Sequence, residues 1–592
     1  MLVSNGKEKD MKKRICSAVL SMLIAGGMVP YMNIYIPAET VCAYESAQNE
    51  KEIDGIVYTL YNDFAEVTGC GKDVSGEVIL QSEVNGLPVK YISGSAFFDC
   101  NKIEKLTVPE SVVGIHSSAF MGCDGLTELN LSDSVKSIGD SAFENCRNLK
   151  TINLPKSVLY YGQDVFAGTQ WLKDRQKEDP LVIVNGWVLD GNECYGNVVI
   201  PDTAEAIAKC AFGKYNRVSN ISIPETVKYI GQDAFAGTQW LSNMKREDPL
   251  VVVNGYLIDG TFCSGDVVIP DTVKTICASA FEHCSEITSV VIPESVTCID
   301  ECAFSNCANL TYARIEGAVS EWGACSFGWC EKLETADVTG TVTSLADSTF
   351  SHCISLKKVT LPETLTTIEP MAFYMCKSLE SVNLPASVTE IRYETFYRCE
   401  KLKEVTIPES LTCIEEATFT GCASLKSVNI PENVIKLEPF AFSRCTGLQN
   451  VTLPSSLKEI GEKAFWDCGS LTEMTIPDSV KTIGGEVFLE CREKFTLCGS
   501  EGSEAQKYAG ENGIKFTAKQ TGTETDDVLY GDVNADGVID VTDISELSVA
   551  LVDYIELEDG AARRADVTRD GIVAINDLAV IRQYLSKKID KL

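Results

Sequence analysis

Two acidic segments near the C-terminus have the spacing of a loop that binds a hard divalent cation. Oxygen donors in the first would come from Asp532, Asn534, Asp536, the carbonyl of Val538, Asp540 and Asp543. Gly537 stands at the sixth position, where such a loop turns sharply. Ca²⁺ accepts this many oxygen ligands in a flexible geometry, whereas Mg²⁺ demands a tighter octahedron. The segment therefore predicts a calcium site.

The second segment starts 34 residues later, at Asp566, and matches the first less completely. Its donors would be Asp566, Thr568, Asp570, the carbonyl of Ile572 and Asp577. Thr568 replaces the asparagine of the first loop, and Ala574 leaves one coordination position to water. Three carboxylates instead of four predict the weaker of two Ca²⁺ sites. The alternative interpretation, a pair of solvated acidic loops, does not explain why the spacing occurs twice.

Each loop is followed by a predicted amphipathic helix, and the loop fixes the position of that helix. Six apolar residues are expected to pack the two helices together: Ile544, Leu547, Leu551, Leu578, Ile581 and Leu585. Calcium would then contribute directly to folding, because it organises the loops and the loops fix the helices. No helix is predicted before the first loop, since TGTETDDVLYG is unsuited to one.

The repeated loop and helix, GDVNADGVIDVTDISELSVAL and ADVTRDGIVAINDLAVIRQYL, resemble a type I dockerin over residues 530–592. The resemblance implies binding to a cohesin of a cellulosome scaffoldin. In that family positions 10 and 11 of each loop help to select the cohesin, which implies a partner-binding role for Val541, Thr542, Ile575 and Asn576. The two pairs differ, which argues against the symmetric two-way binding of some dockerins.

Most of the chain is a repeat of 23 residues. Phe recurs at this interval from Phe97 to Phe488, except for Leu189 and Ile258, which lie in two near-copies containing EDPLV. In each repeat alternating apolar residues predict a short strand, and a following Pro ends it. A single turn cannot bury its apolar columns alone, so the turns must stack. The sequence predicts a β-rich solenoid with parallel strands stacked in a right-handed coil, followed by a small all-α module.

The pattern L-x-x-V-x-I-P-E-S-V-x-x-I-x-x-x-A-F-x-x-C resembles the BspA-like class of leucine-rich repeats, over roughly residues 52–518. That class is associated with adhesion and with binding host or neighbouring-cell molecules, and fold alone assigns no ligand. The predicted divisions are a signal peptide 1–43, an N-terminal cap 44–96, the solenoid 97–498, a C-terminal cap 499–518, a linker 519–529 and the dockerin 530–592.

The N-terminal segment predicts secretion. Lys12, Lys13 and Arg14 precede an apolar stretch that reaches the small-residue cleavage pattern at Ala43. Gly and Pro interrupt this stretch, which argues against an uncleaved membrane anchor, and no later segment is long and apolar enough to span a bilayer. We therefore expect an extracellular protein without integral membrane association.

Cysteines recur three residues after the Phe, from Cys100 to Cys491. Stacked cysteines would have parallel Cβ vectors, which suit the dihedral angle of a disulfide badly, so a ladder of buried free thiols is predicted. A metal array is disfavoured because paired CxxC motifs are absent. Cys302 and Cys325 share another phase and are the first candidates for a disulfide.

The formal net charge of −34 argues against a nucleic-acid partner, and three histidines limit imidazole catalysis. No catalytic motif is found. The favoured function is therefore a non-catalytic cellulosome component whose repeats present a surface to an unknown protein or glycan. The alternatives are a polysaccharide-degrading hydrolase, which would need two carboxylates flanking a cleft, and an adhesin or inhibitor directed at a protein.

Outward-facing strand residues, expected on the concave side, are mostly Thr, Asn and Ser. Few of them are the aromatic or Arg residues that anchor sugars or protein partners. This face therefore fits either a plain exposed strand or shallow multivalent recognition.

Overall fold

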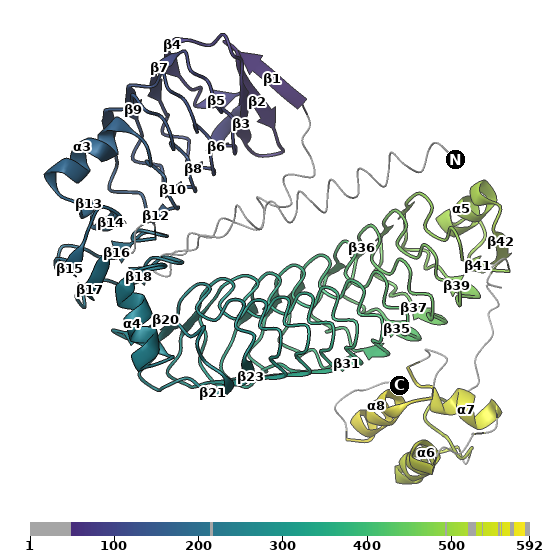
Figure 1. The fold of residues 1–592 in the computed structure, drawn as a ribbon. Coiled ribbons are helices and arrows are strands. Elements are labelled where there is room, and N and C mark those ends of the chain that lie inside the picture. Colours follow the sequence, from purple (N-terminus) through teal and green to yellow (C-terminus); the bar gives the residue numbers. More distant parts are fainter. Residues whose placement is uncertain are drawn as a thin grey trace.

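The computed structural model describes residues 49–213, 217–491, 494–518, 529–535, 537–553, 557, 559–568 and 573–586. A solenoid of stacked turns extends from β3 (Ala65–Cys70) to β42 (Lys515–Ala518), and a small helical region follows toward the C-terminus (Figure 1). The solenoid predicted from the 23-residue period is confirmed. The predicted signal peptide lies outside the described residues, as do residues 519–528 of the predicted linker.

One strand of each turn is the strand predicted from the alternating apolar residues. These strands stack in parallel, with breaks, in the order β4 (Gly76–Ile79), β7 (Ile103–Thr107), β9 (Glu128–Asn130), β11 (Thr151–Asn153), β15 (Gly196–Val199), β17 (Val218–Ser222), β21 (Gly265–Val268), β23 (Ile287–Ile292), β25 (Tyr312–Ile315), β27 (Thr335–Val338), β29 (Lys358–Thr360), β31 (Ser381–Val382), β33 (Glu404–Val405), β35 (Ser427–Asn429), β37 (Asn450–Thr452), β39 (Glu473–Thr475), β41 (Thr496–Gly499) and β42.

Each turn also has a second, shorter strand, which the sequence reasoning did not predict. This second series is β6 (Leu87–Ile92), β8 (Gly114–Ile115), β10 (Ser137–Ile138), β12 (Tyr160–Tyr161), β14 (Trp187–Asp190), β16 (Ala206–Ile207), β18 (Tyr229–Ile230), β20 (Tyr256–Asp259), β22 (Thr275–Ile276), β24 (Cys298–Ile299), β26 (Glu321–Trp322), β28 (Ser344–Leu345), β30 (Thr367–Ile368), β32 (Glu390–Ile391), β34 (Cys413–Ile414), β36 (Lys436–Leu437), β38 (Glu459–Ile460) and β40 (Thr482–Ile483). Most of these strands have only two residues.

In many repeats a proline shapes the turn between the two strands. The carbonyl of Pro408 accepts a hydrogen bond from the N–H of Leu411 at 3.2 Å, and Pro385 accepts one from Val388 at 3.1 Å. Proline ends the first strand because it has no N–H to offer the ladder, and its carbonyl closes the turn. The apolar side chain that follows is thereby directed into the core.

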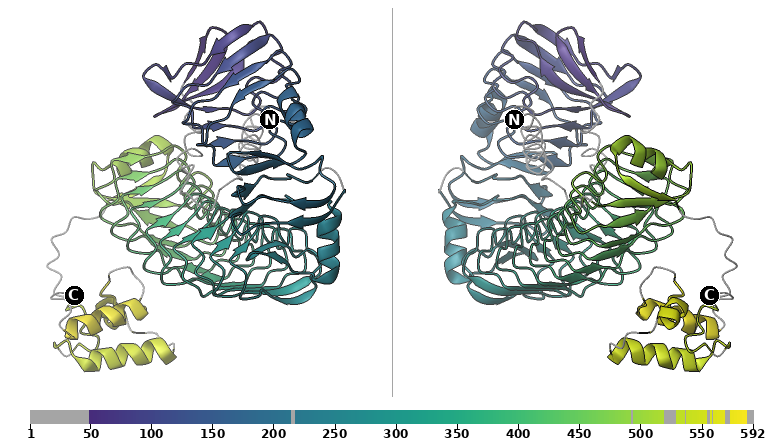
Figure 2. Two further views of the ribbon diagram at one scale, coloured as in Figure 1. Left: turned by 90° about the vertical axis from the view of Figure 1, so that its left-hand side faces the viewer. Right: turned by 90° about the vertical axis from the view of Figure 1, so that its right-hand side faces the viewer.

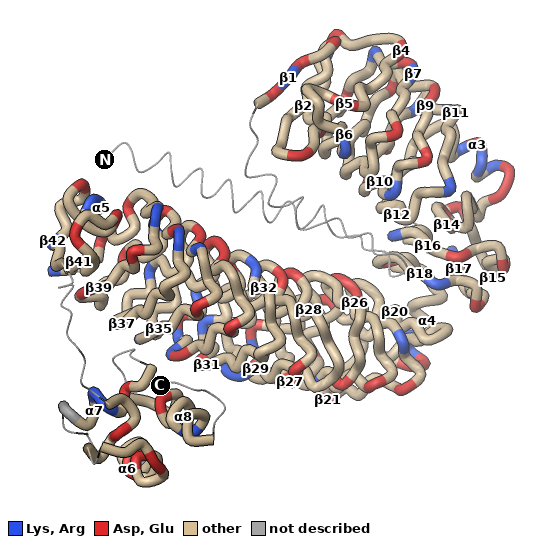
Figure 3. The backbone as a smooth tube through the Cα atoms, turned by 180° about the vertical axis from the view of Figure 1, so that it is seen from behind, with Lys and Arg blue, Asp and Glu red and all other residues tan. Residues whose placement is uncertain are grey.

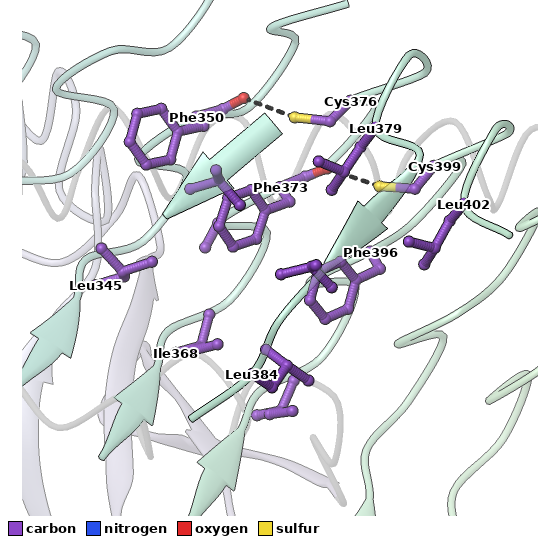
Figure 4. Close-up of a cluster of buried hydrophobic side chains, with 14 of the residues drawn as sticks. Leu345, Phe350, Ile368, Phe373, Cys376, Leu379, Leu384, Phe396, Cys399 and Leu402 are labelled. Carbon is purple, nitrogen blue, oxygen red and sulfur yellow. Dashed lines mark hydrogen bonds between the residues drawn. The ribbon is translucent and has the colours of Figure 1, made fainter. Parts of the chain in front are cut away.

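The core is a column of phenylalanine rings surrounded by aliphatic side chains (Figure 4). Phe350, Phe373 and Phe396 are fully buried, and their ring centroids are 5.7 and 5.5 Å apart. Each turn that has the Phe supplies one ring, and rings of neighbouring turns contact one another. Stability therefore comes from neighbouring turns, as the period predicted.

The predicted ladder of free thiols is confirmed, since all the described cysteines are free. Most ladder thiols donate to the Phe carbonyl of the preceding turn, as from Cys376 to Phe350 at 3.2 Å and from Cys399 to Phe373 at 3.3 Å (Figure 4). Cys100 and Cys284, each the first ladder thiol of its stretch, donate to other backbone carbonyls. Burial raises the pKa of the Cys491 thiol to about 11, so it stays a neutral donor. Cys302 and Cys325 are also free, so the disulfide considered for them is not formed.

The two EDPLV segments interrupt the column instead of acting as simple wide loops. Helices α3 (Gln170–Glu178) and α4 (Gln239–Glu247) begin after Thr169 and Thr238, whose hydroxyls cap the first turn. The Trp171 ring packs on Phe166 and the Trp240 ring packs on Phe235, both at 4.9 Å between centroids. Each tryptophan thus closes one stack of phenylalanines.

A hairpin follows each of these helices, β13 (Val182–Val184) with β14 and β19 (Val251–Val253) with β20. The turn between its strands is Asn-Gly with both residues at positive φ, as at Asn185 and Gly186. The hairpin strands β14 and β20 contain Leu189 and Ile258, the two positions that lack Phe. The repeat loses its phenylalanine there because a hairpin replaces part of the coil.

The array bends around these two insertions, as Figures 1 and 2 show. The long strands, such as β9, β17 and β23, lie on the outer side of the bend together with α3 and α4, and the short strands line the inner side (Figures 1 and 3). The expectation that the long-strand face would be concave is therefore wrong. The coil bends toward its narrower side, where most strands have two residues.

Both ends of the array are covered. At the N-terminal end β1 (Asn49–Ile53), β2 (Ile56–Leu60) and β3 form an antiparallel sheet, and β5 (Glu83–Val84) pairs with β6. At the other end the predicted short helix is α5 (Glu504–Asn512), which ends at Gly513 in the left-handed conformation. The predicted strand after it is β42. These elements cover the apolar faces of the terminal turns.

The described residues of the C-terminal region form three helices, α6 (Val541–Asp553), α7 (Asp559–Ala565) and α8 (Ile575–Leu585). The packing predicted for the helices after the two loops is confirmed, because all six predicted apolar residues belong to one cluster around the buried Leu547 and Ile581. The helix α7 was not predicted. No helix among the described residues has the length and apolar character needed to cross a membrane.

Candidate functional site

The first acidic loop is held by hydrogen bonds from its own backbone to its carboxylates. Asp543 is fully buried and accepts from the N–H groups of Asn534, at 3.2 Å, and Asp540, at 2.8 Å. Asp532 is also buried and accepts from the N–H of Gly537 at 2.9 Å. Gly537 has φ near +87°, which a side chain rarely adopts. These hydrogen bonds hold the loop around a small polar interior that contains the two carboxylates.

The other predicted donors of this loop lie at its edge. Asp540 and Asn534 are half-buried, and the side chain of Val538 is exposed, which leaves only its carbonyl as a donor. The hydroxyl and N–H of Thr542 both donate to Asp540, at 2.6 and 2.7 Å, and these bonds lower the pKa of that carboxyl group. Asp536 lies outside the described residues.

The second loop repeats the hydrogen bonds of the first at equivalent positions. Asp577 is fully buried and accepts from the N–H groups of Thr568 and Ala574, both at 2.9 Å. The Thr568 hydroxyl also donates to Asp577, at 2.9 Å, and Asp566 is half-buried beside it. Asp570 and Ile572 lie outside the described residues. The threonine that replaces the asparagine of the first loop therefore still supplies an oxygen inside the loop.

The chemistry of these residues fits a hard cation. Asp543 and Asp577 are carboxylates removed from water, and no ion pair among the described residues neutralises either one. A buried charge of this kind needs a partner of opposite charge. Within the described residues, no three His, Cys, Asp or Glu side chains converge tightly enough to hold a metal ion by themselves. A complete ligand set would therefore also need oxygens from Asn534, Thr568 and the backbone, and from the acids at positions 536 and 570.

One residue that the sequence reasoning missed connects the two loops. Arg564, in the last turn of α7, donates from Nε to the carbonyl of Asp532 at 2.7 Å and from Nη2 to the carbonyl of Val533 at 3.2 Å. Its own carbonyl accepts from the N–H of Gly531 at 2.8 Å. The helix-forming run AARRA was the available signal for α7. Because Arg564 directly precedes the second loop in sequence, it couples the backbones of both loops.

The four residues implied as cohesin contacts lie at the starts of α6 and α8. Val541 and Ile575 expose 70% and 73% of their surface, and Thr542 and Asn576 are also exposed. Val541 and Ile575 place a branched apolar side chain at the first position of each helix. The loops fix these positions because each helix begins at the tenth position of its loop.

The fold and the loops together define a solenoid repeat protein with a small paired-loop module. The BspA type leucine rich repeat region matches residues 82–185, 190–258, 253–380 and 366–494, and the dockerin type I domain matches residues 530–587. The chain therefore belongs to the BspA-type leucine-rich repeat family and carries a type I dockerin domain. No catalytic domain is among the matches, and a dockerin implies attachment to a cohesin.

Several solved structures are similar to this chain. A leucine-rich repeat protein from Bacteroides ovatus ATCC 8483 is 22% identical, with 79% of this chain and 100% of that chain covered and a TM-score of 0.31. A leucine rich cell surface protein from Faecalibacterium prausnitzii A2-165 is 21% identical, with 78% and 98% covered and a TM-score of 0.29. A leucine-rich repeat protein from Eubacterium ventriosum ATCC 27560 is 20% identical, with 74% of this chain and 93% of that chain covered and a TM-score of 0.33. No curated protein matches the chain.

Proposed function

We propose that this protein is a secreted, non-catalytic component of a cellulosome. Its dockerin binds a scaffoldin cohesin in a calcium-dependent manner, and its repeat array presents a binding surface to a protein or glycan. The observation that carries the docking role is the matched pair of fully buried aspartates, Asp543 and Asp577, each held by two backbone N–H groups at the same loop positions. The dockerin match over residues 530–587 supports it.

The proposal assigns the first Ca²⁺ ion to Asp532, Asn534, Asp536, the Val538 carbonyl, Asp540 and Asp543. It assigns the second, weaker ion to Asp566, Thr568, Asp570, the Ile572 carbonyl and Asp577. Bound calcium would supply the positive charge that the buried carboxylates need. The chain's own residues then do the docking: the loops hold α6 and α8 so that Val541, Thr542, Ile575 and Asn576 meet the cohesin.

The experiment is capture of the full chain on immobilised cohesins, with calcium and with excess chelator. We expect retention only with calcium. Val541→Asp should lose retention while calorimetry still shows calcium binding, because Val541 is exposed and its side chain is not a ligand. Glu546→Gln, an exposed acid on the same helix, is the control and should be retained like the wild type. Retention in excess chelator, or equal retention of Val541→Asp, would contradict the proposal.

Substitution of Arg564 tests whether its hydrogen bonds to the first loop, and not only its positive charge, affect calcium affinity. Arg564→Met keeps much of the aliphatic side chain but removes both hydrogen bonds to the first loop. We expect weaker calcium binding at the first site and a smaller effect at the second, since the lost bonds are to Asp532 and Val533. Arg582→Met, which removes the same charge from an exposed position of α8, should leave both affinities within about twofold.

A further inference from the structure

One edge of the solenoid carries a run of aromatic and basic side chains. They stand one or two residues after the central Phe in the turns from Phe327 to Phe465, except in the turn of Phe419, where Thr420 and Gly421 take these positions. The residues are Trp329, His352, Tyr374, Tyr397, Arg398, Arg444 and Trp466. We call this set the cationic-aromatic strip. The Trp329 and His352 rings stack with centroids 3.7 Å apart and planes 7° apart, and Tyr374 and Tyr397 stack at 4.8 Å and 5°. The Arg444 guanidinium lies over the Trp466 ring, 4.7 Å from its centroid.

The backbone at this edge favours small residues, which makes the strip unusual. The second residue after the Phe has a positive φ in turn after turn, and Asp99, Asn145 and Asn306 are the residue types that suit it. In the strip the same position is taken by larger side chains: Trp329, His352, Met375, Arg398 and Arg444, with φ between 55° and 63°. Bulky residues in this conformation are strained, and such strain is typically retained where a side chain has a role beyond folding.

The residues that follow the Phe in these turns are locally basic. In the five turns from Phe350 to Phe442, the eight residues after each Phe include eight Lys or Arg and three Glu, a local charge of 8 − 3 = +5 in a chain of −34. Blue segments are frequent around β29, β31 and β35 in Figure 3. Lys357 and Lys403 pair with Glu334 and Glu380.

The two arginines of the strip remain available to a ligand. Both Arg398 and Arg444 are exposed, and within the described residues neither is part of an ion pair. They stand two turns apart on the same column, which corresponds to about 10 Å along the array. An exposed guanidinium group that forms no ion pair is well suited to a bidentate contact with a carboxylate.

The arrangement of the rings indicates which polymer would fit. A neutral sugar chain binds on exposed ring faces, but here Trp329 and His352, and Tyr374 and Tyr397, each cover one face of the other. Arg398 and Arg444, which form no ion pair among the described residues, stand beside these rings. A protein partner would favour a broad patch with buried central anchors, whereas this strip is about one side chain wide and follows the axis of the array. Those features favour a linear ligand with regularly spaced negative charges.

We propose that the cationic-aromatic strip binds an acidic polysaccharide whose repeating units are uronic acids. This proposal rests on one part of the proposed function, that the array presents a binding surface. It does not depend on docking to a cohesin. Uronate carboxylates meet Arg398 and Arg444, and the sugar hydroxyls meet the edges of Tyr374, Tyr397 and His352. Neutral glucans bind less well because stacking covers one face of each ring and because they carry no carboxylate for the two arginines.

The test uses the full chain and short oligogalacturonates, which do not form gels with calcium, in titration calorimetry. We expect the double variant Arg398→Gln/Arg444→Gln to lose about tenfold or more in affinity, and binding of the wild type to weaken with salt. The control is Lys105→Gln/Arg147→Gln, which removes the same two charges from N-terminal turns and should change affinity by less than about twofold. Circular dichroism checks that both variants are folded.

Four outcomes would overturn the proposal: no oligogalacturonate binding by the wild type, an equal loss in the control, equal affinity for a neutral β-glucan, or tighter strip-dependent binding of single-stranded RNA. The same preparations are tested on immobilised cohesin with chelator. Chelation should abolish cohesin capture and leave oligogalacturonate binding unchanged, because the strip is built without metal ligands. Failure of cohesin capture alone would count against docking, and failure of glycan binding alone would count against the strip.

Discussion

The thiol ladder predicts a specific cost for removing a single sulfur atom. Cys376 is fully buried, and its thiol donates to the carbonyl of Phe350 at 3.2 Å. In Cys376→Ala that carbonyl keeps its bond from the Cys353 N–H at 3.1 Å but loses its side-chain partner. The lost bond is worth about 0.5–1.5 kcal/mol, and the removed sulfur costs about 1 kcal/mol more in lost burial. We therefore expect the free energy of unfolding to fall by about 1.5–2.5 kcal/mol.

The assay is equilibrium unfolding in guanidinium, with two comparison variants. Cys376→Ser keeps a donor at the same place, so its loss should be about 1 kcal/mol, from reduced packing alone. Cys413→Ala removes a half-buried cysteine of β34 outside the ladder and should cost less than Cys376→Ala. The reasoning is refuted if Cys376→Ala and Cys413→Ala cost the same. Titration of thiols in denaturant without reductant provides a second check, since any shortfall would mean that some cysteines are bridged.

Three further predictions follow from the insertions, the loops and the strip. Trp171→Ala and Trp240→Ala should each lower the free energy of unfolding by about 3–5 kcal/mol, and by similar amounts, because each ring closes a phenylalanine stack at the same distance. Calorimetric unfolding measures both losses, and clearly unequal losses would contradict this prediction. Asp532→Asn should weaken total calcium binding more than Asp566→Asn in titration calorimetry, and equal losses would contradict the order of the two sites. Burial and the nearby Lys377 lower the pKa of His352 from 6.5 to about 4, so the unfolded chain binds the extra proton between these values and stability should fall by about 1 kcal/mol as pH drops through them. His352→Phe should remove this dependence in unfolding curves recorded from pH 7 to pH 4.

The features that could be predicted from sequence are those that every turn needs. Phe, the inward aliphatic residues, Pro and Cys recur because each turn must fill the same column, end the same strand and satisfy the same Phe carbonyl. Their period therefore predicts the coil, the thiol ladder and the stacking. The two aspartates at the last position of each loop are of the same kind, since loop geometry requires them in both copies.

The features that were missed depend on contacts that no local pattern encodes. The short strands have two residues, such as Thr367 and Ile368, which is too few for an alternation to be visible. The direction of the bend depends on the relative width of the two faces, which only the assembled coil reveals. The role of Arg564 arises because α7 brings it against a loop more than 30 residues earlier in the chain.

The most informative positions for function are those where a repeat departs from its own pattern. The column two residues after the Phe is set by backbone conformation, so Asn, Asp and Gly there carry little information about a ligand. Trp329, Arg398 and Arg444 occupy it against that preference, in a stretch of turns that only Gly421 interrupts. A consensus sequence of the repeat hides these residues, because a consensus keeps only the residue types that most turns share. In a solenoid the shared residues determine the fold, and the ligand must be recognised by the minority of turns whose exposed residues differ.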